Sequence, residues 1–488
     1  MLFNSYTYIF LFLPFVVLVY FYLNYKRLSV IAKIWLIITS LLFYSYWNYS
    51  YLTLLLGSII VNYSLGLWFI SPKRILLGDK VKRFVLLTGI IFNIGLLAYY
   101  KYADFFITNF NLLSGSSLDL MRLTLPLAIS FFTFQQIAFL LDCYRNIVKD
   151  RDFLDYCLFV SFFPQLIAGP IVHHREMMPQ FARNRNKVVR WDNLSIGLML
   201  FSVGLFKKVV IADTFSVWAN AGFNNIASLS LFNSWIASLS YTCQLYFDFS
   251  GYTDMAVGSA LLFNIKLPYN FLSPYKASNI QDFWRRWHIT LGRWIRDYVY
   301  IPLGGNRLGI HRTSINIFVS FFLIGLWHGA GWTFILWGIL HGIGSIIYRY
   351  WKKYGFQLPS LCAILITFLF VNFTWVIFRA STINDAINFF KCMLGVQGVM
   401  LPESIKDFSI WMGFSSFTFG PVIERINGSW VTMPMLLTSL SIIFYCRNSN
   451  ELKKSFTPTR NWLIFLTFII VSSLISLSRV NEFIYFQF

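Results

Sequence analysis

The chain has 488 residues, of which 57% are hydrophobic and only 12% are charged. A water-soluble core of this size could not bury so much apolar surface, so the composition excludes an ordinary soluble domain and indicates an integral membrane protein. In a soluble protein, the net charge of +20 would suggest a nucleic-acid partner. In a membrane protein it predicts basic loops against anionic membrane lipids, and we expect no nucleic acid.

Apolar runs long enough to cross a bilayer recur along the chain and predict an all-α polytopic membrane protein with about 11 transmembrane helices. Neither an internal repeat nor a low-complexity linker divides the sequence, so residues 1–488 are expected to form a single membrane domain. The predicted spans begin near Tyr8, Val30, Leu52, Phe84, Leu194, Phe232, Ile315, Thr333, Leu361, Val431 and Trp462.

Basic residues predict the orientation of the first spans. Lys26, Arg27 and Lys33 follow the first span, the turn after the second has no basic residue, and a further basic run from Lys73 to Arg83 follows the third. Loops rich in lysine and arginine stay in the cytoplasm, so we expect the chain to begin outside. The opening apolar stretch is interpreted as a retained span, because it is too long for a signal peptide and has no small-residue cleavage site.

Two apolar segments are too short and too interrupted to be simple spans. Residues 123–142 contain Pro126, and residues 159–172 contain Pro164 and the pair Gly169-Pro170. Irregular backbone survives at membrane depth only where protein or water satisfies its polar groups. These segments therefore predict re-entrant or broken helices that line a cavity.

Residues 241–258 place acids and amides in an otherwise apolar span. Two carboxylates at membrane depth need partners. We favour the interpretation that they pair with arginines and lock helices together, and direct participation in catalysis is the alternative. The polar residues of this segment are Gln244, Asp248, Ser250, Thr253 and Asp254.

Residues 279–298 predict an amphipathic helix at the cytoplasmic interface, with tryptophans on one face and arginines mostly elsewhere. Within it, His288 is either an ordinary interfacial histidine of a membrane anchor or a functional group. The apolar face comprises Trp284, Trp287, Leu291, Trp294, Ile295 and Tyr298.

The turn that follows, Leu303-Gly304-Gly305-Asn306-Arg307, has the composition of a backbone nest for phosphate oxygens. Turns of this composition are also common without any ligand. The turn alone therefore does not establish a phosphate site.

Residues 325–331 place His328 between glycines inside an apolar run. Gly325 and Gly329 are four positions apart, which is typical of a face of small residues that packs against another helix. The alternative is that the glycines leave space for a substrate to approach His328, whose neutral imidazole can accept a proton near pH 7.

The last six residues, Phe483-Ile484-Tyr485-Phe486-Gln487-Phe488, are unusually apolar for a chain end, since termini are normally frayed and polar. An aromatic belt at the membrane interface would explain this composition. The alternative is that Tyr485 presents its hydroxyl inside a cavity.

Four motifs together resemble a known family. They are QLIAGPI (165–171), YFDFSGYTDMA (246–256), FWRRWHITLGRWIRDYVYIPLGGN (283–306) and LWHGAGWTFILWGILHG (326–342). The chain resembles the bacterial membrane-bound O-acyltransferases, in the branch that contains the membrane components of alginate and peptidoglycan O-acetylation. The likeness extends over almost the whole chain, and a slight preference for the peptidoglycan members comes from HHREMMPQF (173–181).

The resemblance implies a tunnel through the bacterial cytoplasmic (inner) membrane, with acetyl-CoA as the acyl donor on the cytoplasmic side and no bound cofactor. His328 matches the essential histidine of the family, and His288 matches its second histidine. We expect the donor site to include Trp284, Arg285, Arg286, Trp287, Trp327 and Asn306.

The implied reaction needs no metal, and the six scattered cysteines predict neither a disulfide framework nor a metal site. His328 would take a proton from a hydroxyl as it attacks the thioester. If that hydroxyl is Tyr485, the product is an aryl ester whose phenol leaving group has a pKa of about 10, so onward transfer to an alcohol is favourable. The sequence has no G-x-S-x-G element, so we expect an extracytoplasmic SGNH-like esterase partner to deliver acetyl to a polysaccharide acceptor.

Two other functions are compatible with the sequence. A transporter or flippase would also use broken helices and intramembrane acids, although no matched inverted halves are visible. A structural scaffold for polysaccharide export is the other possibility. Release of free thiol from acetyl-CoA distinguishes the enzyme from both.

Overall fold

The computed structural model describes residues 1–71, 78–403, 406 and 418–477. Helices dominate these residues, and the two strands among them, β1 (Met400–Pro402) and β2 (Thr418–Gly420), form a short parallel pair. The predicted all-α class is therefore confirmed.

The elements up to the middle of the chain are η1 (Thr7–Phe12), α1 (Leu13–Tyr25), α2 (Ser29–Ser45), α3 (Ser50–Ile70), α4 (Asp79–Leu97), η3 (Ala98–Tyr102), α5 (Ala103–Ser114), α6 (Ile129–Tyr144), α7 (Phe153–Ser161), α8 (Phe163–Leu166), α9 (His174–Ala182), η4 (Asn184–Asn186), α10 (Trp191–Phe206), η5 (Lys207–Ala212), α11 (Asp213–Asn224) and η6 (Ile226–Ser228). The elements that follow are α12 (Leu231–Leu262), η7 (Pro274–Lys276), α13 (Ile280–Arg286), α14 (Ile289–Ile295), η8 (Arg296–Tyr300), α15 (Gly309–His328), α16 (Trp332–Lys353), α17 (Ser360–Arg379), α18 (Ile383–Met393), η10 (Glu424–Ile426), α20 (Thr432–Tyr445), α21 (Ser449–Ser455) and α22 (Arg460–Ser476).

The helices agree with a multi-pass membrane protein. Six helices of the described chain are long and apolar enough to cross a bilayer, and α2, α20 and α22 are shorter apolar helices. All of the predicted span starts lie in a helix or directly before one. The starts near Phe232 and Thr333 fall in α12 and α16, which are long helices of more polar composition.

The described chain forms two compact units. The first unit comprises Met1–Leu205, Tyr252–Asn270 and Lys453–Ile470. The second comprises Phe206–Gly251, Phe271–Leu452 and the residues described from Val471 onward. The expectation that the whole chain is one membrane domain stays a prediction.

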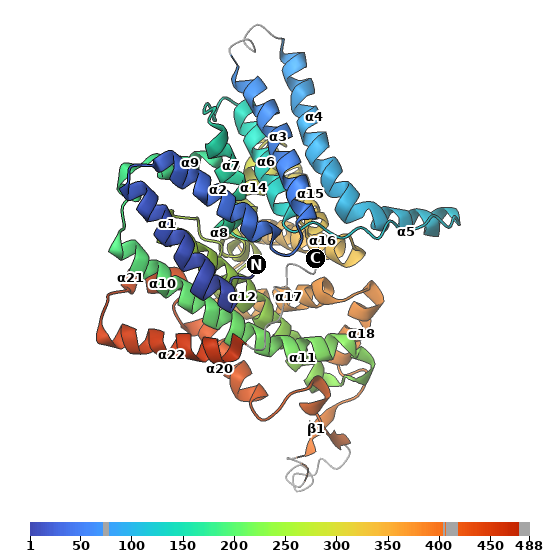
Figure 1. Cartoon of the computed structure of the whole chain (residues 1–488). Helices are drawn as coiled ribbons and strands as arrows, with labels where there is room; N and C mark the ends of the chain where they lie inside the picture. Colours follow the sequence, from blue (N-terminus) through green and yellow to red (C-terminus); the bar gives the residue numbers. More distant parts are fainter. Residues whose placement is uncertain (72–77, 404–405, 407–417, 478–488) are drawn as a thin grey trace. The chain divides into compact units, whose positions relative to one another are not determined.

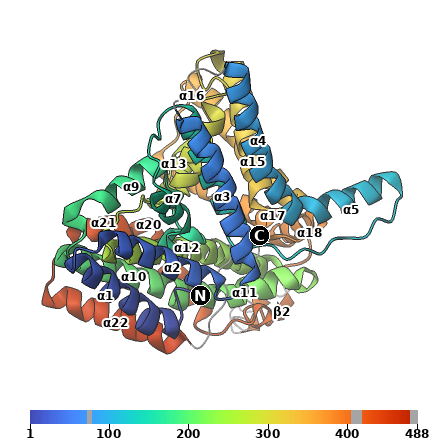
Figure 2. The ribbon, with the colours of Figure 1, turned by 45° about the horizontal axis from the view of Figure 1, so that its top comes forward.

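In the first unit, α3, α4 and α6 pack against one another, and α5 points away from them (Figures 1 and 2). Amide side chains join these helices where apolar surface alone gives little attraction in lipid. Asn62 of α3 and Asn93 of α4 donate to each other's oxygen at 3.1 and 2.6 Å, and Gln136 of α6 donates to Ser58 of α3 at 2.8 Å. These hydrogen bonds fix the three helices side by side.

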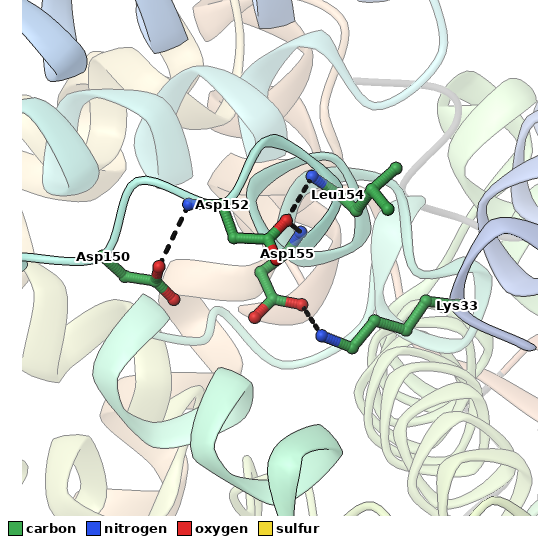
Figure 3. Close-up of polar contacts among 5 residues, drawn as sticks. All are labelled: Lys33, Asp150, Asp152, Leu154 and Asp155. Carbon is green, nitrogen blue, oxygen red and sulfur yellow. Dashed lines mark hydrogen bonds and ion pairs between the residues drawn. The ribbon is translucent and has the colours of Figure 1, made fainter. Parts of the chain in front are cut away.

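The start of α7 is held by aspartates, as Figure 3 shows. Asp152 caps the helix, because its carboxylate accepts from the backbone N–H groups of Leu154 and Asp155 at 2.8 and 3.1 Å. Asp155 forms an ion pair with Lys33 of α2. The two contacts together set where α7 begins and where it meets α2.

The predicted broken helix over residues 159–172 is confirmed in the first unit. Helix α7 ends at Ser161, the single turn α8 follows, and the backbone is then irregular but buried until α9. Gln165 satisfies part of this backbone by donating to the carbonyl of Phe159 at 2.7 Å, and it accepts from Gln135 at 2.8 Å.

For residues 123–142 a break within the helix was the wrong prediction, whereas a re-entrant course of this segment stays a prediction. Helix α6 runs without interruption from Ile129 to Tyr144. Pro126 lies before the helix, where its missing N–H removes no helical hydrogen bond.

In the second unit, a buried lysine sits between two carboxylates. Lys208 Nζ lies 2.7 Å from Asp213 Oδ1 and 2.8 Å from Asp248 Oδ1, and all three side chains are buried. Lys208 and Asp213 are brought together by the π-helix η5, in which the N–H of Asp213 donates to the carbonyl of Lys208. Asp248 of α12 thus has the interhelical role that we predicted, but its partner is a lysine instead of an arginine.

We predict that Lys208→Met lowers the free energy of unfolding by about 3–5 kcal/mol, because it leaves two buried carboxylates without their cation. Thermal unfolding of the protein in detergent measures the effect. The neighbouring Lys207, which donates to Ser449 at 2.6 Å and is less buried, provides the control variant Lys207→Met. Adding Asp213→Asn and Asp248→Asn to Lys208→Met should restore part of the stability, and no recovery would contradict the charge argument.

Candidate active site

The predicted amphipathic helix over residues 279–298 is broken at its histidine. Helix α13 ends at Arg286, α14 begins at Ile289, and His288 between them has φ 44° and ψ 50°. A left-handed conformation costs a non-glycine residue about 1–2 kcal/mol. The prediction of a continuous helix was therefore wrong, and the break occurs at the residue of greatest chemical interest.

His288 is enclosed by aromatic rings. None of its surface is exposed, and its ring lies 4.8 Å from that of Phe249 and 6.1 Å from that of Trp327. Burial lowers the pKa of His288 to about 3, so the imidazole is neutral at physiological pH. The interpretation of His288 as an ordinary interfacial histidine is excluded by this burial.

His328 is the last residue of α15 and is 4% exposed. Its ring lies 5.0 Å from that of Trp327, 5.1 Å from that of Trp337 and 5.3 Å from that of Phe378. Since Trp327 contacts both His288 and His328, one indole joins the two predicted catalytic histidines.

The glycines around His328 serve helix packing. A Cβ atom on Gly325 would lie 2.4 Å from the carbonyl oxygen of Phe334, and one on Gly338 would lie 2.9 Å from the Cα of Gly325. A Cβ atom on Gly329 would overlap the ring of Phe334 at 2.2 Å. The packing interpretation is confirmed for Gly325 and Gly329, and the space beside them is filled by α16.

A third histidine, His341 of α16, belongs to the same cluster. Trp284 Nε1 donates to His341 Nδ1 at 3.1 Å, and His341 Nε2 lies 3.0 Å from Thr374 Oγ1. An indole nitrogen can only donate, so Nδ1 is the acceptor and the proton of a neutral ring is on Nε2. Thr374 in turn donates to the carbonyl of Val371 at 2.8 Å, which completes the chain of hydrogen bonds.

His341 is part of the motif at residues 326–342, but no role was predicted for it. The available signal was the spacing of Trp337 and His341, which are four positions apart and therefore share a face of α16. In the structure, their rings lie 4.7 Å apart. The pair Trp337 and His341 thus marks the face of α16 that carries the cluster.

The residues predicted for the donor site fall into two groups. Trp284 and Trp287 belong to the aromatic cluster. Trp287 is buried and stacks on Phe283 with ring centroids 5.7 Å apart, and the partly buried Trp284 lies 5.8 Å from the ring of Trp337. Arg285 and Asn306 are exposed, and Arg286 forms an ion pair with Asp282 at 3.0 Å. The polar members thus lie outside the cluster that holds the histidines.

The turn at residues 303–307 does not have the geometry of an anion nest. The N–H groups of Gly304, Gly305 and Arg307 donate to the carbonyls of Ile301, Tyr300 and Gly304. Asn316 of α15 also binds this turn, donating to the carbonyl of Gly305 at 2.9 Å. Because these N–H groups have partners within the chain, the nest hypothesis was wrong. The remaining predicted residue, Tyr485, lies outside the described residues.

Comparison with known proteins identifies the family of the chain. A sequence model of the membrane-bound O-acyltransferase family matches residues 17–384, which include all three histidines of the cluster. The chain belongs to this family. Its resemblance to acyltransferases is therefore confirmed, and it is a multi-pass membrane O-acyltransferase.

Individual relatives narrow the branch of the family. The peptidoglycan O-acetyltransferase of Helicobacter pylori is 45% identical, over 100% of this chain and 98% of that protein. The probable alginate O-acetylase AlgI of Pseudomonas aeruginosa is 37% identical, over 83% of this chain and 76% of its own length. The teichoic acid D-alanyltransferase of Bacillus subtilis is 31% identical, over 52% of this chain and 69% of its own length. The chain thus falls in the peptidoglycan and alginate branch of this acyltransferase family.

We predict that His288→Gly leaves the protein more stable than His288→Ala by about 1 kcal/mol, since glycine adopts the left-handed conformation without a Cβ penalty. Both variants remove the imidazole, so thermal unfolding of the pair isolates the backbone effect. In a regular helix alanine would be the more stable of the two. If His288→Ala proves more stable than His288→Gly, the backbone at position 288 becomes helical when the imidazole is removed.

Proposed function

We propose that this acyltransferase takes acetyl from acetyl-CoA on the cytoplasmic side of the bacterial inner membrane and passes it outward for O-acetylation of a polysaccharide. Peptidoglycan is the favoured acceptor, because the peptidoglycan O-acetyltransferase aligns over the full chain at the higher identity. The observation that supports acyl transfer most directly is the contact of His288 and His328 with the same indole, Trp327.

His328 is the proposed general base. It takes the proton of the attacking hydroxyl, whose oxygen forms a bond to the carbonyl carbon of the thioester. The carbon–sulfur bond then breaks, and the thiolate leaves with that proton. The position of His328 at the C-terminus of α15 assists this step, because the partial negative charge of the last carbonyls stabilises a positive imidazolium.

His288 is proposed to shape the donor end of the site as a neutral ring. Its burial among aromatic side chains supports a role in packing and polarising the donor instead of carrying charge. A transporter would use its intramembrane ionic groups to bind and release a substrate. Here the buried Lys208, Asp213 and Asp248 pair with one another, which favours a structural role for them over transport.

We predict that His328→Gln abolishes thiol release from acetyl-CoA while the protein still folds, since the amide cannot act as a base near neutral pH. The assay follows free thiol from the purified protein in the presence of an acceptor hydroxyl. His311 lies on the same helix and is exposed, so His311→Gln is the matched control. Wild-type thiol release by His328→Gln would overturn the general-base assignment, and its absence from the wild type would favour the transporter.

We further propose that Tyr485 carries the acetyl group to an SGNH-like esterase partner outside the membrane. Tyr485→Phe removes one oxygen and keeps the ring, so we expect polysaccharide acetylation to disappear while the protein level is unchanged. Mass spectrometry of the intact wild-type protein should find acetyl on its C-terminal peptide. The exposed Tyr445 provides the control variant Tyr445→Phe. Full acetylation by Tyr485→Phe would mean that the partner receives acetyl without this tyrosine.

A further inference from the structure

Besides Trp327, three tryptophans of the second unit contact the histidines of the cluster, namely Trp284, Trp337 and Trp375. The indole N–H groups of these three differ in whether they have an acceptor. Trp284 Nε1 donates to His341 Nδ1 at 3.1 Å, and Trp375 Nε1 donates to the hydroxyl of Tyr275 at 3.1 Å. Trp337 Nε1 is buried, yet no atom of the described residues accepts a hydrogen bond from it. The middle indole of the cluster is therefore the exception.

An N–H group buried without an acceptor is costly, by about 1–3 kcal/mol. Such groups are rare in folded proteins and each calls for an explanation. A phenylalanine at position 337 would fill most of the same space without that cost. Because the protein has a tryptophan here despite this cost, we infer that the N–H group finds an acceptor when substrate is bound.

The position of Trp337 indicates which acceptor that is. Its ring contacts His328 edge-on, with centroids 5.1 Å apart and planes at 88°. Its ring also lies 4.7 Å from that of His341 and 5.6 Å from the stacked ring of Trp375. A thioester carbonyl attacked by a hydroxyl beside His328 must come within a few ångströms of this indole.

We propose that Trp337 is a catalytic residue whose Nε1–H donates to the carbonyl oxygen of the acyl thioester. This proposal rests on the general-base role of His328 proposed above. As the hydroxyl oxygen bonds to the carbonyl carbon, the electron pair of the C=O π bond moves to oxygen, and His328 takes the hydroxyl proton. The oxyanion accepts from Trp337 until the C=O bond re-forms, the carbon–sulfur bond breaks and the thiolate takes the proton from His328.

The surroundings of Trp337 suit this task. Transition-state charge is best stabilised by donors already in place in a dry site, so that no solvent has to reorganise. The fixed tautomer of His341 contributes by holding Trp284 through Nδ1 and Thr374 through Nε2. His341 is thus a positioning residue for the ring cluster, and Trp337 is the member whose polar atom is left for substrate.

The test compares the variants Trp337→Phe, Trp235→Phe and Trp375→Phe. We expect Trp337→Phe to lower kcat for thiol release by about 100-fold, the usual effect of losing one oxyanion donor, with little change in KM. Trp235, which donates to the carbonyl of Met393 at 3.0 Å and has no ring contact with the histidines, gives the activity control Trp235→Phe. A wild-type kcat for Trp337→Phe alongside an inactive His328→Gln would overturn the role of Trp337 and leave the general base intact.

Stability separates the catalytic role from simple packing. Trp337→Phe and Trp375→Phe remove similar volume, but only the second deprives the hydroxyl of Tyr275 of its donor. We therefore expect Trp375→Phe to unfold at the lower temperature. Greater destabilisation by Trp337→Phe would show that its N–H is bound to a neighbouring ring in the resting protein and would overturn the proposal.

A benzothiophene analogue of tryptophan at position 337 isolates the N–H group further, since it keeps the two-ring shape and replaces nitrogen by sulfur. We expect the protein carrying it to unfold like the wild type and to show the same loss of kcat as Trp337→Phe. Retention of full activity by this protein would attribute the effect of Trp337→Phe to lost volume alone.

Discussion

The contacts of His328 depend on the close approach of α15 and α16 at Gly325 and Gly338. The two backbones meet so closely that neither position has room for a Cβ atom. In lipid, an apolar side chain gains little free energy when it moves from lipid to a helix interface, because both are apolar. Close packing of small residues therefore holds such helices together. Because the glycine contact fixes the two helices along their axes, it also decides which rings of α16 face His328.

A second constraint is that buried polar groups need partners within the protein, because an unpaired polar group away from solvent is costly. His341 meets it with two hydrogen bonds that also define its tautomer, and Lys208 meets it with two carboxylates. His288 lies in a strained backbone conformation that turns the chain between α13 and α14. Strain of this kind persists where the surrounding structure over-determines it, and it clusters at active sites.

Much of the fold and part of the site could be predicted from the sequence. Hydropathy located the helices, and the prolines and Gly169 located one broken segment, because both signals are local. The break at His288 left no such signal, since tertiary packing imposes a left-handed conformation on a residue that ordinarily avoids it. The contact of Trp327 with His288 was equally hidden, because it joins residues that are 39 positions apart. Periodicity along α16 pointed to Trp337 and His341, but whether an indole N–H has an acceptor depends on the neighbouring helices.

The π-helix at η5 has a consequence for how the sequence of this protein can change. Residues five apart lie on one side of a π-helix, whereas in an α-helix they lie well round the axis from each other. The pairing of Lys208 with Asp213 therefore requires one more residue in this turn than an α-helix would hold. The ion pair therefore depends on the length of the segment as well as on its charges. A deletion of one residue here would separate the ion pair even if every charged side chain were kept.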